Sequence, residues 1–341
     1  MIPLPAEVRA LRSPGRVIAI VLAAIVLADL AALGVELSQQ SRPAGATVLA
    51  SGPYAGRTLY AAPTSAAGAA RHEQSATARA RLRWLARQPQ AVWLTGGSPR
   101  SSARTVATVE RRARTSGAVP SFVVYDIPHR DCSGGYSAGG AASREAYVRY
   151  IDAIGAQLGR TRTIVVLEPD SLAGIDCLDG AQQYGRLQLL TWAVEHLAKR
   201  RGTEIYLDGG NSGWQTPSTM AKRLIAAGIV DARGFAVNVS NYDPTASEIR
   251  YGRQISAQVG WKHFVVDTSR NGARARPDGW CNPSGARVGA PPGTPPSDPA
   301  VDALLWIKHP GESDGTCGES PDPAGTFDPR LALRLLAHTR H

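Results

Sequence analysis

Carboxyl and amide side chains recur where short apolar runs of this sequence end. Carboxylates close FVVYDIPHRDC, IVVLEPDS, IYLDGG, FVVDTSR and LLWIKHPGESDG, and amides close FAVNVSNY. The residues are Asp131, Asp170, Asp208, Asn238, Asn241, Asp267 and Asp314, with Tyr125 and Lys308 beside them. If these runs are strands of one parallel barrel, their C-terminal ends share a face and the groups converge. The pattern predicts a cleft lined with acids.

Converging carboxylates need a chemical reason, because like charges held close raise one another's pKa and cost stability. Acid–base catalysis supplies that reason. One carboxyl stays protonated and donates to a leaving oxygen, while another remains charged. A single Asp in such a place more often caps a helix or makes a turn. Four together favour the catalytic interpretation.

Tryptophans accompany the same strand ends. Trp93, Trp214, Trp280 and Trp306 lie in or beside them, and the C–H faces of sugar rings pack on indole as other apolar groups do. Since a Trp is more often part of the core, we expect at least one of the four, Trp306, to be structural. The others predict platforms for a polysaccharide.

The elements that position these residues alternate between strand and helix patterns. The predicted strands are residues 91–95, 122–128, 163–170, 204–209, 234–241, 263–269 and 303–310. Residues 146–158 and 184–197 place apolar side chains on one helical face. Repeated strand–helix–strand units imply right-handed crossovers and a parallel sheet. About seven units, with no glycine-rich phosphate loop after the first strand, favour a closed or nearly closed barrel over a doubly wound sheet.

The N-terminal region has a different composition from the rest. Arg9, Arg12 and Arg16 precede an apolar run over residues 17–35 that only Asp29 interrupts. This pattern predicts a signal peptide or signal anchor within residues 1–36, cleaved or retained, and hence a secreted or membrane-anchored extracellular protein. Residues 37–70 are rich in Ala, Ser, Gly and Pro and predict a low-complexity tether. The catalytic domain is expected over residues 71–341.

The formal net charge of +10 would allow nucleic-acid or anionic-surface binding. Basic residues are spread over Arg79 to Arg87, Arg111 to Arg114 and Lys199 to Arg201, within helix-like stretches and without a nucleic-acid motif. We interpret them as solvated helix faces and expect no nucleic-acid partner. The protein is expected to act as a monomer.

Four cysteines suit an exported protein with two disulfides. Cys132, Cys177, Cys281 and Cys317 allow three pairings, and nearest-neighbour pairing would close loops of 45 and 36 residue steps. None has the two-residue spacing of a zinc knuckle or a His partner in metal-ligand register. We therefore predict no metal and no other cofactor.

Seven motifs together resemble glycoside hydrolase family 6, the secreted cellulases with a distorted, incomplete α/β barrel and an inverting mechanism. They are VVYDIPHRDCS, VLEPDSLA, YLDGGNSGW, NVSNY, FVVDTSRNG, WCNPSG and WIKHPGESDG, in the family's order, over roughly residues 92–317. The resemblance implies the TIM-like fold of about seven strands, a β-glucan substrate, and disulfides Cys132–Cys177 and Cys281–Cys317.

The resemblance also assigns catalytic roles. Asp170 looks like the general acid, and Asp131 like the neighbour that raises its pKa and can accept a proton through water. Asp314 is similar to the aspartate often proposed as base, so the identity of the base stays open. Tyr125 matches the tyrosine that distorts the sugar, and Ser137 the serine of a mobile loop that holds water.

Substrate-binding roles follow in the same way. Trp93 and Trp280 match platforms on the glycone side, and Trp214 one on the leaving-group side. The polar groups assigned to sugar binding are Asp208, Asn238, Asn241, Lys308 and Glu312. Two departures stand out: Asn211 replaces a common His, which keeps hydrogen-bonding capacity without titrating, and the C-terminal TFDPRLALRLLAHTR lacks tryptophans often found there.

The short Cys281 to Cys317 segment resembles the open-cleft members, so we predict an endo-β-1,4-glucanase. One alternative is an exo-acting cellobiohydrolase, and another is a non-catalytic glycan-binding protein on the same fold. A metal-dependent deacetylase or an esterase is a third, which would need a His-rich ligand set or a Ser nucleophile elbow on a strand–turn–helix unit, and HExxH does not occur.

Overall fold

The computed structural model describes residues 52–132, 134–273 and 277–337. The predicted signal or anchor segment, residues 1–36, and the first part of the predicted tether lie outside these residues. Within the described part, no helix combines the length and the apolar composition needed to cross a membrane.

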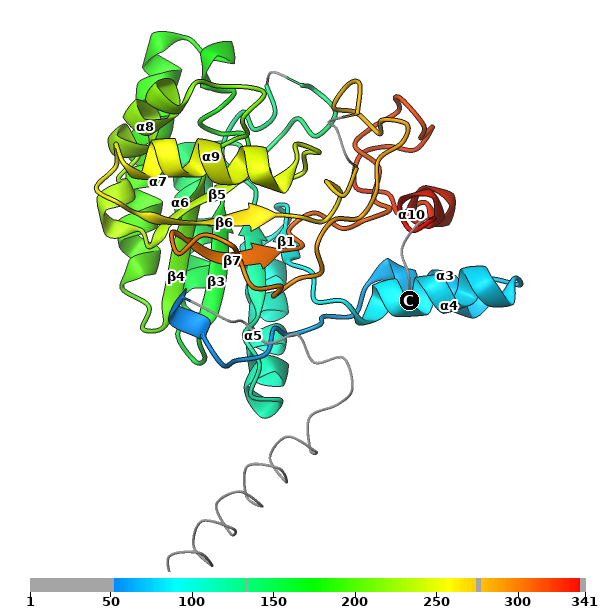
Figure 1. Ribbon diagram of the computed structural model, residues 1–341. Coiled ribbons are helices and arrows are strands. Elements are labelled where there is room, and N and C mark those ends of the chain that lie inside the picture. The colour runs from blue at the N-terminus through cyan, green and yellow to red at the C-terminus, as the bar shows by residue number, and fades with distance from the viewer. Residues whose placement is uncertain (1–51, 133, 274–276, 338–341) are drawn as a thin grey trace, which may run out of the picture. The chain divides into compact units, whose positions relative to one another are not determined.

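Seven parallel strands form one sheet, in the order in which they occur along the chain. They are β1 (Val92–Leu94), β2 (Ser121–Val124), β3 (Thr163–Leu167), β4 (Thr203–Asp208), β5 (Gly234–Val237), β6 (His263–Asp267) and β7 (Val301–Leu305). All seven predicted strands are present, and the sheet curls into an incomplete barrel (Figure 1). The prediction of a parallel α/β barrel is confirmed.

The barrel is not closed by strand pairing. In the described residues β1 pairs with β2 alone and β7 with β6 alone. Individual hydrogen bonds join the two edges instead. The Ala91 N–H donates to the Trp306 carbonyl at 3.1 Å, and the Trp93 indole N–H donates to the Ile307 carbonyl at 2.8 Å.

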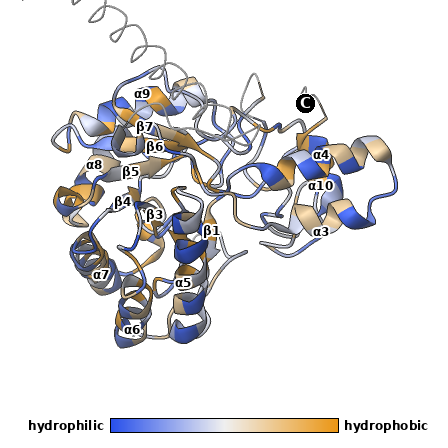
Figure 2. Ribbon diagram, turned by 90° about the horizontal axis from the view of Figure 1, so that it is seen from below, coloured by the Kyte–Doolittle hydropathy of each residue, from blue (hydrophilic) through white to orange (hydrophobic). Residues whose placement is uncertain are grey.

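Helices connect the first six strands and cover the outside of the sheet. They are α5 (Pro99–Thr115), α6 (Arg144–Gly155), α7 (Gly180–Ala198), α8 (Pro217–Ala226) and α9 (Thr245–Ser256), and Figure 2 shows them as an arc around the strands. Ser98, Ser143, Asp179 and Thr216 cap the first four with side-chain oxygens. Their apolar faces share one core with the sheet.

The connection from β6 to β7 contains no described helix. Its place is taken by α3 (Ser65–His72), α4 (Ala76–Arg87) and α10 (Pro329–Leu335), which enclose a separate apolar cluster around Trp306. Trp306 is 1% exposed and packs edge-on against Trp84. As predicted, this tryptophan is structural.

The predicted tether is ordered in its described part. Tyr54 and Leu59 are buried in the barrel interior cluster, and the Tyr54 hydroxyl donates to the Thr163 carbonyl at the start of β3. Residues from Gly52 onward are thus packed on the same compact unit as the catalytic barrel.

Several strands end earlier than predicted because the backbone turns into left-handed conformations. Glu168 and Asp170 follow β3 with φ of 52° and 66°, and Asn238 and Ser240 follow β5 with 66° and 59°. Non-glycine residues rarely hold such angles, and they gather at functional sites. Here they lie at the C-terminal end of the barrel, where the polar residues were predicted to converge.

Candidate active site

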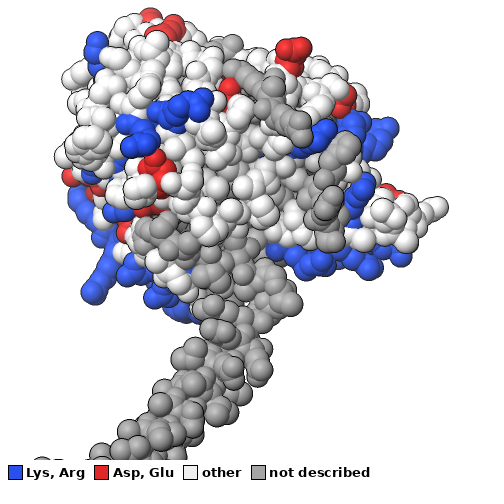
Figure 3. All heavy atoms as spheres, viewed as in Figure 1, with Lys and Arg blue, Asp and Glu red and all other residues white. Residues whose placement is uncertain are grey.

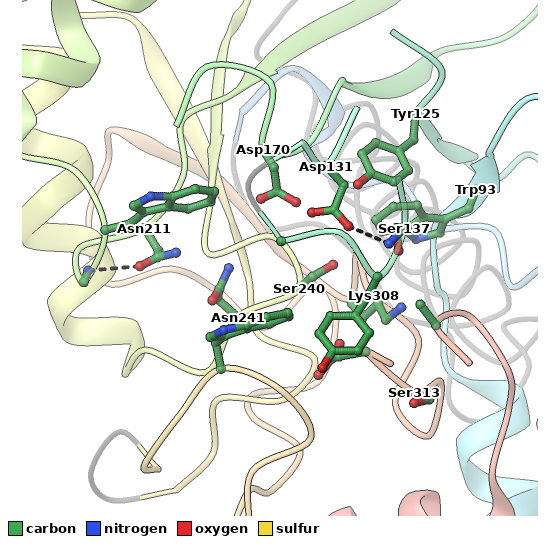
Figure 4. A pocket seen from close by; sticks show the side chains of 17 residues that line it. Trp93, Tyr125, Asp131, Ser137, Asp170, Asn211, Ser240, Asn241, Lys308 and Ser313 are labelled. Atoms are coloured by element: carbon green, nitrogen blue, oxygen red, sulfur yellow. Dashed lines mark hydrogen bonds between the residues drawn. The ribbon is translucent and has the colours of Figure 1, made fainter. Parts of the chain in front are cut away.

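A cleft of about 480 Å³ lies at the C-terminal ends of the strands. Most of the predicted site residues line it: Trp93, Tyr125, Asp131, Ser137, Asp170, Trp214, Asn241, Trp280, Lys308 and Asp314. They come from segments far apart in the sequence and meet as Figure 4 shows. The parallel barrel therefore brings the predicted groups together.

Asp170 lies among other charged groups at the centre of the cleft. Burial, followed by the nearby charges of Asp131 and Asp314, raises its pKa to about 7, and Lys308 opposes the shift. In Figure 4 the carboxyl groups of Asp170 and Asp131 point toward each other. A carboxyl held in this way keeps its proton near neutral pH and can donate it.

Asp131 belongs to the loop that follows β2, and this loop is fixed at several points. Its Oδ2 accepts the Ser137 N–H at 2.5 Å. Arg130 donates to the carbonyls of Ser137, Tyr125 and Thr95 and lies over the Tyr125 ring. The Cys132–Cys177 disulfide joins the loop to the segment after β3. The positions of Asp131 and Asp170 are thus coupled covalently.

Tyr125 is 6% exposed and packs edge-on against Trp93, with ring centroids 5.6 Å apart. Burial, then the charges of Asp170 and Asp131, raises the pKa of its hydroxyl. The phenol stays neutral at any physiological pH and can act only as a hydrogen-bonding group beside the acids.

Asp314 is held by three donors on its side-chain oxygens. Oδ1 accepts from Arg270 Nη1 at 2.8 Å, while Oδ2 accepts from the Tyr242 hydroxyl at 2.7 Å and the Asn282 N–H at 3.1 Å. Arg270 is 1% exposed. The Cys281–Cys317 disulfide closes the loop around this pair. Both disulfides therefore have the pairing that the family resemblance implied.

Aromatic and basic side chains form the walls of the cleft. Trp214 and Trp280 are 39% and 45% exposed, so each presents an indole face to a ligand. Lys308 Nζ lies 5.5 Å from the centre of the Trp93 ring and 3.7 Å from Glu312 Oε2. Such a surface suits sugar rings, which combine apolar faces with a hydroxyl rim.

Three residues predicted to bind substrate do not line the cleft. Asp208 is 1% exposed and accepts the N–H groups of Asp170 and Gly210. Asn238 is fully buried and donates to backbone carbonyls of the neighbouring segments. Glu312 pairs with His309 and Lys308 and is not among the residues that line the cleft. All three lie within contact of residues that do line it.

Asp267 is a structural carboxylate. It is 1% exposed and accepts four backbone N–H groups, from Ser240, Ser269, Ile307 and Lys308. These bonds tie the ends of β5, β6 and β7 together. Unlike Asp131, Asp170 and Asp314, Asp267 does not line the cleft, as expected of a structural carboxylate.

Sequence patterns did not single out several residues of the cleft. Tyr136, Ser240 and Ser313 line it, and Tyr136 packs edge-on against Trp280. Arg270 was present in the DTSRNG motif, but its pairing with Asp314 joins residues 44 positions apart. No local sequence signal could have revealed that pair.

In the described residues no group of three or more His, Cys, Asp or Glu side chains could hold a metal ion. Carboxyl groups set between indoles at the C-terminal end of a parallel barrel, one with its pKa raised to about 7, are typical of a glycoside hydrolase. The family model for glycosyl hydrolases family 6 matches residues 54–336. The chain belongs to this family, as its motifs indicated.

Proteins similar to this chain include several endoglucanases. The chain is 40% identical to endoglucanase A of Cellulomonas fimi, over 83% of its own length and 61% of that protein. It is also 40% identical to endoglucanase 1 of Streptomyces halstedii, over 82% of its own length and 88% of that protein. The chain thus spans less than two thirds of the first of these relatives. The solved endoglucanase Cel6 of Mycobacterium tuberculosis, in complex with a thio-linked cellobioside, is 43% identical, with a TM-score of 0.78, over 82% of this chain and 97% of that one. The two disulfides are typical of a protein in an oxidising, extracellular compartment.

Proposed function

We propose that the protein hydrolyses internal β-1,4-glucosidic bonds of cellulose or a related β-glucan with inversion at the anomeric carbon, and that Asp170 is the general acid. The setting of Asp170 carries this proposal. It is the cleft carboxyl whose pKa is raised to about 7, which is the property that an acid catalyst needs near neutral pH.

In the proposed reaction the proton of Asp170 moves to the glycosidic oxygen as the bond from that oxygen to C1 breaks. A water molecule forms the new bond to C1 from the opposite side of the ring and releases one proton to a carboxylate. The hydroxyl of Tyr125 lies beside the acids and favours a distorted sugar at this position. The loop that carries Ser137 positions the water.

We assign the final proton acceptor to Asp131 rather than Asp314. Both oxygens of Asp314 already accept hydrogen bonds from buried donors, so a proton there would displace one of them. Among the described residues, Asp131 accepts one hydrogen bond, from the part-buried Ser137 N–H. Asp314 then supplies fixed negative charge that supports the positive character of the sugar ring in the transition state.

Endo action is favoured over exo action because the tryptophan platforms are partly exposed to solvent. Trp214 and Trp280, 39% and 45% exposed, leave room for a chain that continues past the site. The exo-acting alternative needs a roofed tunnel. A non-catalytic binding protein is disfavoured because such a protein would have no use for a protonated Asp170.

Replacing Asp170 by Asn tests the proposal. The variant should lose activity on carboxymethylcellulose by a factor of at least about 10³, and calorimetry should still detect cello-oligosaccharide binding. Asp176→Asn, an exposed aspartate on the same strand-to-helix connection that pairs with Arg223, is the matched control and should keep full activity. Comparable activity in the Asp170 variant would refute the assignment.

Product analysis tests the remaining parts. Proton NMR of fresh cello-oligosaccharide digests should show the α-anomer first, and the viscosity of carboxymethylcellulose should fall faster than reducing ends appear. An initial β-anomer would exclude inversion. Cellobiose as the single early product would favour the exo-acting alternative.

We also propose that the apolar run of residues 17–35 exports the chain and, where it is retained, anchors it. Mass spectrometry of the extracellular protein would locate its N-terminus. A start beyond residue 35 would exclude the anchor.

A further inference from the structure

The two ends of the barrel carry opposite charge. The five strand-to-helix connections at the cleft end, residues 95–98, 125–143, 168–179, 209–216 and 238–244, contain seven acidic residues and one basic residue, a formal charge of −6. The five helix-to-strand connections at the far end, residues 116–120, 156–162, 199–202, 227–233 and 257–262, contain seven basic residues and one acidic residue, a formal charge of +6. We call the surface formed by the second set the basal face.

Three of the seven cations on the basal face are not used within the fold, whereas Arg162, Arg200 and Lys262 form hydrogen bonds. Arg233 pairs with the buried Asp302, but Arg160, Lys199 and Arg201 are exposed and form no salt bridge with any residue that the structure describes. Arg112 and Arg114, in the last turn of α5, and Arg111 just before it are exposed at the same end. Lys and Arg side chains gather along the lower left edge in Figure 3. These exposed cations leave the basal face positively charged, and such a surface attracts anionic partners.

The same face presents a fixed aromatic side chain. Trp261 is 75% exposed, with φ of 61°, and Val230 is 73% exposed. Lys262, the next residue, donates to the carbonyls of Val230 and Ala232, both at 2.7 Å. A bulky residue held in the left-handed region costs free energy and persists only where its surroundings fix it. An exposed indole at the same end of the barrel as exposed cations is the composition of a membrane-interface surface.

The chain also meets the folded unit on this side. Its first described residues, Gly52–Tyr54, lie beside the start of β3 (Figure 1), where Arg162 donates to the Pro53 carbonyl and Tyr54 to the Thr163 carbonyl. Sixteen residues separate the apolar run ending at Val35 from Gly52, a reach of at most about 55 Å when fully extended. A chain held in a bilayer by that run would have the basal face within reach of the lipid headgroups.

We propose that the basal face docks on an anionic phospholipid surface, with Trp261 at the headgroup level and the exposed cations of the same face neutralising lipid phosphates. The acidic cleft then points away from the membrane, toward soluble or wall-associated glucan. Electrostatic attraction draws the basal end to the surface and repels the cleft end, so the charge asymmetry alone sets the orientation.

Quenching of tryptophan fluorescence in the full-length chain tests this proposal. All seven tryptophans lie at or after residue 84, so the N-terminal region contributes nothing to the signal. Vesicles of phosphatidylcholine, with brominated phosphatidylcholine as quencher, are compared with and without phosphatidylglycerol. Quenching should rise with phosphatidylglycerol and fall with added salt. The Trp261→Phe variant should lose the extra quenching that phosphatidylglycerol causes. The Trp280→Phe variant, changed at the cleft, should keep it.

Two matched triple variants measure the contribution of the basic residues to vesicle binding. R160E/K199E/R201E should weaken binding to phosphatidylglycerol vesicles at least tenfold, since each basic residue near an anionic surface is worth roughly a fivefold change in partitioning. R100E/R104E/R144E makes the same change in the first two turns of α5 and the first turn of α6, at the cleft end, and should bind as the parent does. Both should fold and hydrolyse carboxymethylcellulose normally.

Equal vesicle binding by the two triple variants would overturn the proposal, as would unchanged quenching in Trp261→Phe. A parent protein that binds soluble dextran sulfate but shows no increment with phosphatidylglycerol would assign the face to an anionic polymer and overturn the lipid assignment.

Discussion

The backbone N–H of Asp170 donates to Oδ2 of Asp208 at 3.0 Å, so the proposed acid is positioned by a second, buried carboxyl. Asp208 also accepts the Gly210 N–H at 3.1 Å. Burial and the charge of Asp170 raise the pKa of Asp208 well above its usual value. Asp170 therefore lies in the cleft, and the buried carboxyl of Asp208 fixes its backbone through a hydrogen bond.

Replacing Asp208 by Ala should remove the acceptor that fixes the left-handed turn at Asp170. We expect kcat to fall about 10- to 100-fold with KM little changed, because misplacement of a catalytic group affects the transition state more than ground-state binding. Asp208→Asn, which keeps an acceptor oxygen, should lose much less. Steady-state kinetics on a soluble cello-oligosaccharide distinguish these outcomes, and a large KM increase in the Ala variant would indicate direct sugar binding instead.

The activity should depend on pH through the protonated form of Asp170. Its pKa of about 7 places the loss of kcat as pH rises through neutrality. The negative charge of Asp131 contributes to raising that pKa, so Asp131→Asn should move the basic limb to lower pH in whatever activity remains. A limb that stays in place would show that the charge of Asp131 does not act on the acid.

Stability should respond to the same group. Because the folded-state pKa of Asp170 is raised to about 7 from an unfolded value near 4, the folded protein binds more protons than the unfolded chain between these values. Raising the pH through this window therefore destabilises the fold. Asp170→Asn removes this term, so its melting temperature relative to the parent should increase from pH 4 to pH 8. A constant difference would contradict the raised pKa.

The buried pair of Arg270 and Asp314 should behave as a unit. Arg270→Met leaves the Asp314 carboxylate, 8% exposed, without its cation and should cost about 3 to 5 kcal/mol of unfolding free energy. The double variant Arg270→Met with Asp314→Asn should be less destabilised than the sum of the two single changes. Urea denaturation of all four proteins measures this coupling, and strict additivity would mean that the pair contributes no mutual stabilisation.

Residue order and type determined the broad features of this protein. Alternating apolar runs predicted all seven strands, and strand-end polarity predicted Asp170, Asp131 and Asp314 on one face. These features follow from local periodicity and from the geometry of parallel strands, which any chain with this pattern obeys. The disulfide pairing was not determined by spacing, which left three possibilities, but by the motifs shared with the family.

Tertiary structure decided which strand-end groups reach the cleft. Asp170 and Asp208 both end strands, yet a left-handed turn places Asp170 in the cleft while Asp208 stays beneath it, 1% exposed. Asp267 meets four backbone N–H groups from other segments, and Arg270 meets Asp314 across 44 residues. These outcomes depend on backbone turns and on contacts between distant segments. Local periodicity carries no information about either one.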